Sequence, residues 1–205
     1  MDAKARLDSI VAKLGDLATK AEDLGIELIN IVTALDEADD ALAEDKPKPA
    51  WRPSWYLIAK RYVGHVSEVA GKVHNEVISN MWKSIGWRPQ PDEVPWCAVF
   101  VNFCLDVAGY AGTDSPRARS FEEYGEELIV DDIQIGDIVV LKRGKNPALG
   151  HVTFFEGWCE EAINSNFPRF FLGLGGNQRD SVCVSRYSAK DIVTIRRPTK
   201  GDSDG

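Results

Sequence analysis

The sequence predicts an α+β domain preceded by a long helical arm, and three observations support this. Apolar residues recur in alternating steps of three and four between residues 7 and 42, which is the spacing of a heptad-patterned helix. Helical patterns then recur between residues 54 and 109, and five short strand-like runs follow between residues 137 and 196. Helices followed by a series of short strands are typical of an antiparallel sheet with helices packed against it.

Length and composition indicate one ordinary domain plus an appendage. The chain has 205 residues, of which 44% are hydrophobic and 27% charged, as in globular proteins. No stretch approaches the roughly 20 apolar residues of a membrane span, and the evenly charged N-terminus does not resemble a secretory signal. We therefore expect no membrane span, and synthesis in the cytoplasm without a signal peptide.

Charge and cysteine usage exclude several classes of partner. Residues 1–50 carry 12 acidic and 6 basic side chains, so most of the net charge of −8 lies in the arm. No basic groove with interleaved aromatic residues is evident, so nucleic acid is not an expected partner. The four cysteines have no CxxC spacing for zinc and are too few for a disulfide scaffold of this length. We interpret them as reduced thiols and predict no metal and no cofactor. They are Cys97, Cys104, Cys159 and Cys183.

The N-terminal arm, residues 1–45, is predicted to be a coiled coil. Its seam residues are Leu7, Ile10, Leu14, Leu17, Ala21, Leu24, Leu28, Ile31, Leu35, Ala38 and Leu42. This broad apolar face favours a bundle of three or more helices, formed by self-association or with a partner's helix. The alternative is a single long helix, or a hairpin bent near Gly25, folded onto its own body. Residues 46–53 are charged and rich in proline, and they are expected to form a linker.

The body is predicted to span residues 54–198, followed by a disordered tail at 199–205. Helices are expected over residues 54–64, with Ser54 as a possible cap, over residues 77–85, and over a central, nearly all-apolar segment from Cys97 to Gly109. A short acidic helix is expected near residues 113–125. The five strands are expected at residues 137–141, 151–156, 169–174, 181–187 and 192–196. The first of them, DIVVL, is a continuous β-branched run of the kind buried on both faces.

A candidate nucleophile, Cys97, stands at the start of the central helix. Asp92 and Glu93 are expected to cap this helix, and Pro95 suits its first turn. A thiol in that turn faces unpaired backbone N–H groups and the positive end of the helix dipole, which lower its pKa from about 8.5. A buried free cysteine is more often a small hydrophobic core residue, so this interpretation depends on partner groups elsewhere in the chain. A cysteine nucleophile needs a base and a group that orients the base. His151 opens the run HVTFFEG, and Asn177 closes the run FFLGLGGNQ.

Four motifs give the body its resemblance to a known family. They are PWCAVFVNFCLDVAGYAGTDSPRARS, GDIVVLKRG, GHVTFFEG and LGGNQ, in that order. Together they resemble the CHAP (cysteine, histidine-dependent amidohydrolase/peptidase) families, relatives of the NlpC-type cell-wall peptidases within the papain-like fold. The resemblance covers about residues 55–198 and omits the arm. It implies a papain-like cysteine hydrolase domain.

The resemblance also implies an activity and the residues that carry it. Members hydrolyse peptidoglycan in phage lysins, tail-associated lysins and bacterial autolysins, so the expected substrate is the stem peptide. The expected place of action is the bacterial cell wall, after lysis or delivery in a phage particle. Carried over by position, Cys97 is the nucleophile, His151 the general base and then acid, and Asn177 the group that holds the imidazole. Many members have a glutamate two residues before that asparagine, where this chain has Gly175. The acidic calcium loop of some relatives is not evident here.

Elementary chemistry agrees with this set of residues. Adjacent antiparallel strands lie about 4.8 Å apart, so the ends of the His151 and Asn177 strands can meet beside the helix start. We expect the Asn177 amide oxygen to accept the Nδ1 proton of His151, which leaves Nε2 facing the sulfur. The N–H of Cys97 is expected to stabilise the oxyanion of the tetrahedral intermediate, and the reaction to pass through a thioester. Whether the scissile amide joins sugar lactyl and peptide (amidase) or lies within the peptide (endopeptidase) stays open.

Two further residues are candidates for substrate binding. Trp96 adjoins the nucleophile and is expected to line a cleft, with a core role as the alternative. Arg119 is expected to meet stem-peptide carboxylates, with a merely solvated loop as the alternative. Four other cations flank the same region, namely Arg117, Lys142, Arg143 and Lys145.

Two other functions compete with the hydrolase. One is a structural protein whose coiled-coil arm docks a vestigial hydrolase body into a larger assembly. The other is a cysteine protease or toxin that acts on protein amides, because the same triad serves any acyl donor.

Overall fold

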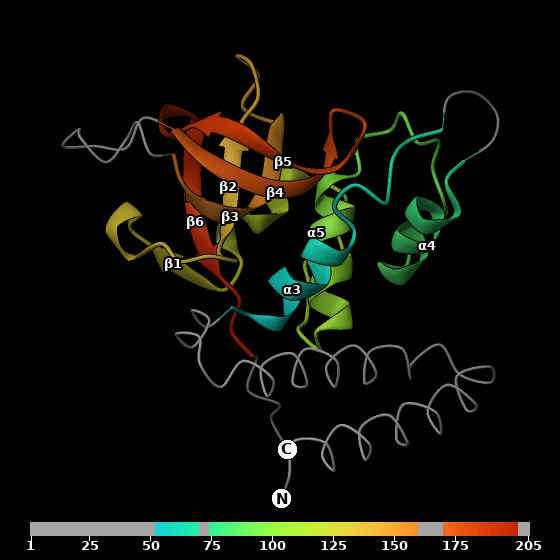
Figure 1. Ribbon diagram of the computed structural model, residues 1–205, viewed down its shortest axis with the longest axis horizontal. Coiled ribbons are helices and arrows are strands. Elements are labelled where there is room, and N and C mark those ends of the chain that lie inside the picture. Colours follow the sequence, from blue (N-terminus) through green and yellow to red (C-terminus); the bar gives the residue numbers. More distant parts are fainter. Residues whose placement is uncertain (1–51, 70–73, 160–169, 201–205) are drawn as a thin grey trace, which may run out of the picture. The chain divides into compact units, whose positions relative to one another are not determined.

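A computed structural model describes residues 52–69, 74–159 and 170–200 and has an α+β architecture, as predicted (Figure 1). The heptad-patterned segment, residues 46–51 of the linker and residues 201–205 of the tail lie outside the described residues. Three α-helices precede the sheet in the described chain: α3 (Ser54–Arg61), α4 (Glu76–Ser84) and α5 (Cys97–Val107). No helix of the described residues is both long and apolar enough to cross a membrane.

The sheet has six strands in the order β1-β6-β2-β3-β4-β5, and all neighbours are antiparallel. The strands are β1 (Glu126–Leu128), β2 (Ile138–Lys142), β3 (Gly150–Trp158), β4 (Phe170–Gln178), β5 (Ser181–Ser188) and β6 (Ile192–Arg197). In the described residues, the 3₁₀ helix η1 (Ala118–Glu123) precedes β1, and η2 (Val130–Asp132) and η4 (Ala189–Asp191) connect strands. The five predicted strands are therefore present, each with slightly different ends.

Strand β2 is buried on both faces, as its β-branched run predicts. Ile138 and Val140 face the main core, whereas Val139 and Leu141 belong to a second cluster with Phe155 and Phe171. Because successive side chains of a strand point to opposite faces, one strand supplies both clusters. Apolar side chains therefore pack on both sides of the sheet at β2.

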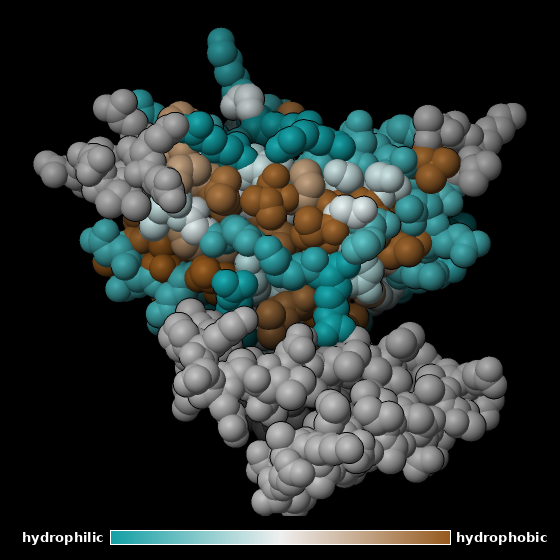
Figure 2. Space-filling view, viewed as in Figure 1, coloured by the Kyte–Doolittle hydropathy of each residue, from teal (hydrophilic) through white to brown (hydrophobic). Residues whose placement is uncertain are grey.

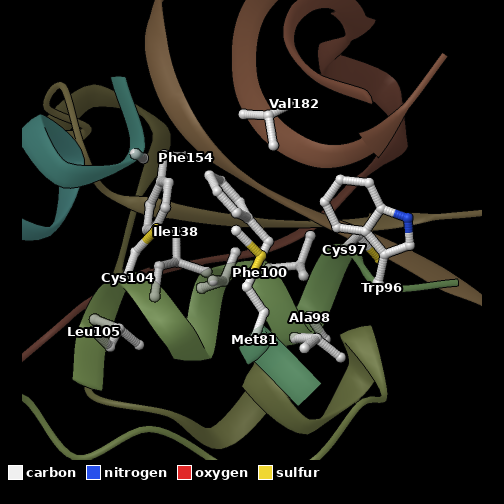
Figure 3. Close-up of a cluster of buried hydrophobic side chains, with 14 of the residues drawn as sticks. Met81, Trp96, Cys97, Ala98, Phe100, Cys104, Leu105, Ile138, Phe154 and Val182 are labelled. Atoms are coloured by element: carbon white, nitrogen blue, oxygen red, sulfur yellow. The ribbon is translucent and has the colours of Figure 1, made fainter. Parts of the chain in front are cut away.

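The main core lies between α5 and the sheet. Phe100 points from α5 toward the strands, with its ring edge-on to Phe154 of β3 at 6.5 Å and to Trp96 at 6.5 Å between centroids (Figure 3). An added Cβ on Gly176 of β4 would lie 2.7 Å from Phe100 Cβ and 2.5 Å from the Trp96 ring, so only glycine permits this close approach of β4 and α5. On the face of the body seen in Figure 2, apolar residues form a band across its middle, and polar residues lie above and below it.

The chain between α5 and β2 differs from the prediction. The short acidic helix is present as the 3₁₀ helix η1, but the edge strand β1, which follows it and pairs with β6, was not predicted. Three residues with two exposed glutamates are too short and too polar to display an alternating pattern, so the sequence gives no strand signal there.

The predicted capping role of Asp92 and Glu93 is also wrong. The N-cap of α5 is Trp96, and no side chain caps it. The Asp92 carboxylate is fully buried, and its Oδ2 accepts the backbone N–H groups of Val69 and Asn75 at 2.9 Å each. Asp92 therefore fixes the segment before α4 instead of the start of α5.

Candidate active site

Cys97 is the first residue of α5, and its side chain is 4% exposed. The first N–H groups of a helix have no partner within the helix, so they point toward whatever lies at its N-terminus. Here the backbone N–H groups of Ala98 and of Val152 on β3 both donate to the sulfur. The helix start thus supplies a polar environment for one atom at the edge of an apolar core.

His151, the second residue of β3, forms a hydrogen bond with the Cys97 thiol. Burial by itself raises the pKa of Cys97. The hydrogen bond to His151, the positive charge of that imidazole and the two backbone N–H groups together outweigh burial, so the pKa lies below its usual value. Burial by itself lowers the pKa of His151. The hydrogen bond to Cys97 and the negative charge of the thiolate outweigh burial, so the pKa of His151 is raised. These opposite shifts favour a thiolate beside an imidazolium. The predicted nucleophile and base are therefore brought together.

Gln178, and not Asn177, contacts the imidazole. The Nε2 atom of His151 lies 3.0 Å from Oε1 of Gln178. The side-chain amide of Asn177 donates instead to Glu68 Oε1 at 2.6 Å. The orienting position expected for Asn177 is thus occupied by its neighbour in the sequence.

An irregularity at the end of β4 explains this one-residue change. The register of β4 against β5 shifts between Gly175 and Gln178, and Asn177 has a φ of 53°. A bulge of this kind inserts an extra residue, so Gln178 takes the face of the sheet that strict alternation would give to Asn177. Asparagine is one of the few residues that adopt positive φ readily, which suits it to the bulge.

Gly175 leaves room for the Gln178 side chain. An added Cβ on Gly175 would lie 2.7 Å from Gln178 Oε1 and 3.0 Å from Thr153 Oγ1, too close for either to stay in place. A side chain at position 175 would therefore displace the Gln178 amide from the imidazole.

The hydrogen bonds of Gln178 determine which nitrogen of His151 carries the proton. The Gln178 NH₂ group donates to the backbone carbonyls of Gly173 and Cys183, so its Oε1 must face the imidazole. Because Gln178 Oε1 can only accept a hydrogen bond, His151 Nε2 must carry a proton. The other ring nitrogen, Nδ1, is then the one that faces the Cys97 thiol. This is the reverse of the predicted assignment, in which Nε2 faced the sulfur.

A second oxygen also reaches His151. The hydroxyl of Tyr187, on β5, lies 3.0 Å from His151 Nε2 and donates to Gln178 Oε1 at 2.9 Å. The two rings are in contact and tilted by 34° to each other, with centroids separated by 5.4 Å. Burial, reinforced by the electrostatic effect of the nearby cysteines, raises the pKa of Tyr187, so its hydroxyl stays protonated.

Trp96 is fully buried, so it lines no accessible surface, and the structure favours the alternative core role. Its indole Nε1 donates to Glu68 Oε1 at 2.9 Å, the same oxygen that accepts from Asn177. Glu68 therefore ties the residue before the nucleophile to the residue before Gln178. No feature of the sequence around Glu68 signals this role.

Arg119 lies on η1 beside the start of β3. Its Nε donates to the Leu149 carbonyl at 3.3 Å, and its Nη1 forms an ion pair with Glu122 at 2.7 Å. The guanidinium thus contacts Leu149, which is two residues before His151 in the chain, and it already has a carboxylate partner. Arg143 acts on the site directly, since its positive charge lowers the pKa of His151 against the net upward shift.

Sequence reasoning missed Gln178 and Tyr187. The available signal was the GGNQRD segment, since two glycines followed by residues that tolerate positive φ indicate an irregular strand end. Tyr187 carried no signal, because its register against β4 depends on that bulge.

In the described residues, no three His, Cys, Asp or Glu side chains are grouped to hold a metal ion. No protein-family model matches the chain, and no curated protein matches it significantly.

Proposed function

We propose that the body is a cysteine-dependent amidohydrolase of the CHAP type, with a papain-like arrangement of nucleophile and base. The observation that carries this proposal is the hydrogen-bonded pair of Cys97 and His151, with the pKa of the thiol lowered and that of the imidazole raised. A buried cysteine without a catalytic partner shows the opposite behaviour, as Cys104 does. Matched shifts of this kind are typical of catalytic pairs.

The proposed reaction is acyl transfer through a thioester. The Cys97 thiolate attacks the carbonyl carbon of an amide, and the oxyanion that forms accepts the N–H of Cys97 at the helix start, an interaction worth about 3 kcal/mol. The imidazolium of His151 gives its Nδ1 proton to the departing nitrogen, and the C–N bond breaks. Neutral His151 then takes a proton from water, which attacks the thioester and releases the acid and the thiolate.

The proposed substrate is the stem peptide of peptidoglycan, cleaved as an amidase or an endopeptidase. The four sequence motifs that resemble CHAP proteins support this choice, and Cys97 and His151 occupy the corresponding positions. In this proposal, Gln178 takes the role of the family's third residue. Arg143 adds positive charge near His151, which suits a peptide that carries carboxylates. The protein is proposed to act at the cell wall, delivered by lysis or in a phage particle.

Digestion of purified cell walls tests the activity. Wild-type protein is expected to release free amino groups, and mass spectrometry of the fragments identifies the bond cleaved. Cys97→Ala is expected to lose this activity, while Cys104→Ala, on the same helix, retains it. Equal release by wild type and Cys97→Ala would overturn the proposal. Cleavage of unfolded protein substrates, with walls left intact, would favour the protease or toxin function.

The arm is proposed to bring several bodies together. The heptad pattern over residues 7–42 supports a homotypic bundle of three or more helices. Multivalent display would keep an acidic enzyme on a polymeric substrate through avidity. Light scattering is expected to give the mass of a trimer or larger for the full chain, and a monomer would overturn this proposal.

A further inference from the structure

The imidazole of His151 has two oxygen acceptors at one nitrogen where a single orienting group would suffice. Oε1 of Gln178 and the hydroxyl of Tyr187 both lie 3.0 Å from Nε2. They come from different strands, β4 and β5, and are joined by their own 2.9 Å hydrogen bond. Each oxygen is therefore held in place by the other as well as by the imidazole.

The direction of each bond follows from the chemistry of the groups. Two backbone carbonyls accept the N–H groups of the Gln178 amide, which fixes its orientation. Its Oε1, which can only accept, therefore faces the imidazole. Tyr187, whose pKa is raised, has one proton and donates it to that Oε1, so its oxygen lone pairs face the imidazole. The N–H at Nε2 is then shared between two acceptors. A hydrogen bond to a charged donor is stronger than one between neutral groups, so both contacts strengthen when His151 is protonated.

We propose that Tyr187 is a second positioning residue for His151, one that stabilises the imidazolium and thereby holds Cys97 as a thiolate. This inference rests on the proposed function. The Tyr187 hydroxyl and Gln178 share the orienting role, so the loss of one leaves the other in contact with Nε2. The Tyr187 ring, which packs against the imidazole, limits its rotation.

The test measures the pKa of the Cys97 thiol from the pH dependence of its alkylation by iodoacetamide, with the modified peptide quantified by mass spectrometry. Tyr187→Phe keeps the ring and removes the hydroxyl, so the pKa is expected to rise by about half a unit to one unit. The alkylation rate below the pKa then falls about three- to tenfold. Tyr124→Phe is the matched control, because Tyr124 is also half-buried and donates its hydroxyl to a carbonyl, that of Ala111, away from His151. The control is expected to leave the Cys97 pKa unchanged.

A double-mutant cycle tests the sharing of the role. Gln178→Ala and Tyr187→Phe each leave one acceptor at Nε2, and the double variant leaves none. The fall in alkylation rate for the double variant is therefore expected to exceed the product of the two single effects. Independent, multiplicative effects would contradict the shared role.

Nitrogen NMR of the wild-type protein gives a measurement that needs no variant to fold. The ¹⁵N shifts of His151 are expected to show a protonated, hydrogen-bonded Nε2 throughout the pH range in which Cys97 titrates. A neutral imidazole protonated at Nδ1 would overturn the inference. A low wild-type Cys97 pKa that Tyr187→Phe does not move would also overturn it, without affecting the proposed function. A wild-type Cys97 that titrates at or above its ordinary value would contradict the proposed function itself.

Discussion

Cys97 and Cys104 lie seven residues apart on α5, and both are largely or fully buried, at 4% and 0% exposed. Their chemistry is opposite. Burial raises the pKa of Cys104 well above the usual value, whereas the environment of Cys97 lowers its pKa in spite of burial. Cys104 is two turns along the helix, where the backbone N–H groups are already used in the helix. For two buried thiols on one helix, the position along the helix and one imidazole therefore determine which of them is reactive.

The largest expected effect is the difference in reactivity between these two thiols. In the folded protein at pH 7, iodoacetamide is expected to modify Cys97 at least about a hundred times faster than Cys104, because each pKa unit changes the thiolate fraction tenfold. Peptide mass spectrometry over a time course measures both rates in one sample. In denaturant the two rates are expected to converge, and a difference that persisted there would contradict an origin in the fold.

Removing His151 should abolish most of that difference. In His151→Ala, burial dominates the pKa of Cys97, so its alkylation rate at pH 7 is expected to fall about tenfold or more. The pH profile should change as well. In wild type the ion pair exists from the lowered pKa of Cys97 up to the raised pKa of His151, and reactivity rises with pH through the former. His65→Ala, at an exposed histidine, is the control and should behave as wild type.

Gly175→Ala is expected to weaken the pair from a distance. The added Cβ would displace Oε1 of Gln178, which it approaches to 2.7 Å, so the support at His151 Nε2 is reduced. We expect a several-fold slower alkylation of Cys97 at pH 6, measured as above. Gly144→Ala controls for lost stability, because its φ of 67° is unfavourable for alanine but no atom lies within 4 Å of the new Cβ. An equal effect of both variants would contradict the clash.

The smallest expected effect on the site is that of Cys104→Ala. Loss of a buried sulfur from the main core should lower the free energy of unfolding by about 1–2 kcal/mol, measured by urea denaturation. The alkylation rate of Cys97 should stay within twofold of wild type. A change beyond that would mean that the two thiols are coupled through α5.

The sequence was sufficient for the elements with strong local patterns. The apolar run after Cys97 and the β-branched run at 138–141 correctly predicted a core helix and a strand buried on both faces. It was not sufficient where long-range packing decides. Asp92 was expected to cap a helix because of its place before one, but its carboxylate binds backbone N–H groups of a different segment.

The candidate site divides in the same way. Cys97 and His151 were found from the sequence because each lies at the start of a strongly patterned element. Asn177 was assigned as the orienting group by its position at the end of its strand, and the bulge there turns the neighbouring Gln178 toward His151 instead. Tyr187 depends on the same bulge and on the register of β5, which local patterns do not encode.

The two-residue connection between β4 and β5 constrains how this protein can be engineered. Gln178 ends one strand, Tyr187 stands on the next, and only Arg179 and Asp180, both with positive φ, join these strands. Lengthening or shortening this connection by a single codon would shift both oxygens away from the imidazole at once, without touching the nucleophile or the core. Loop grafting in this protein should therefore treat that corner as fixed and direct insertions to other loops.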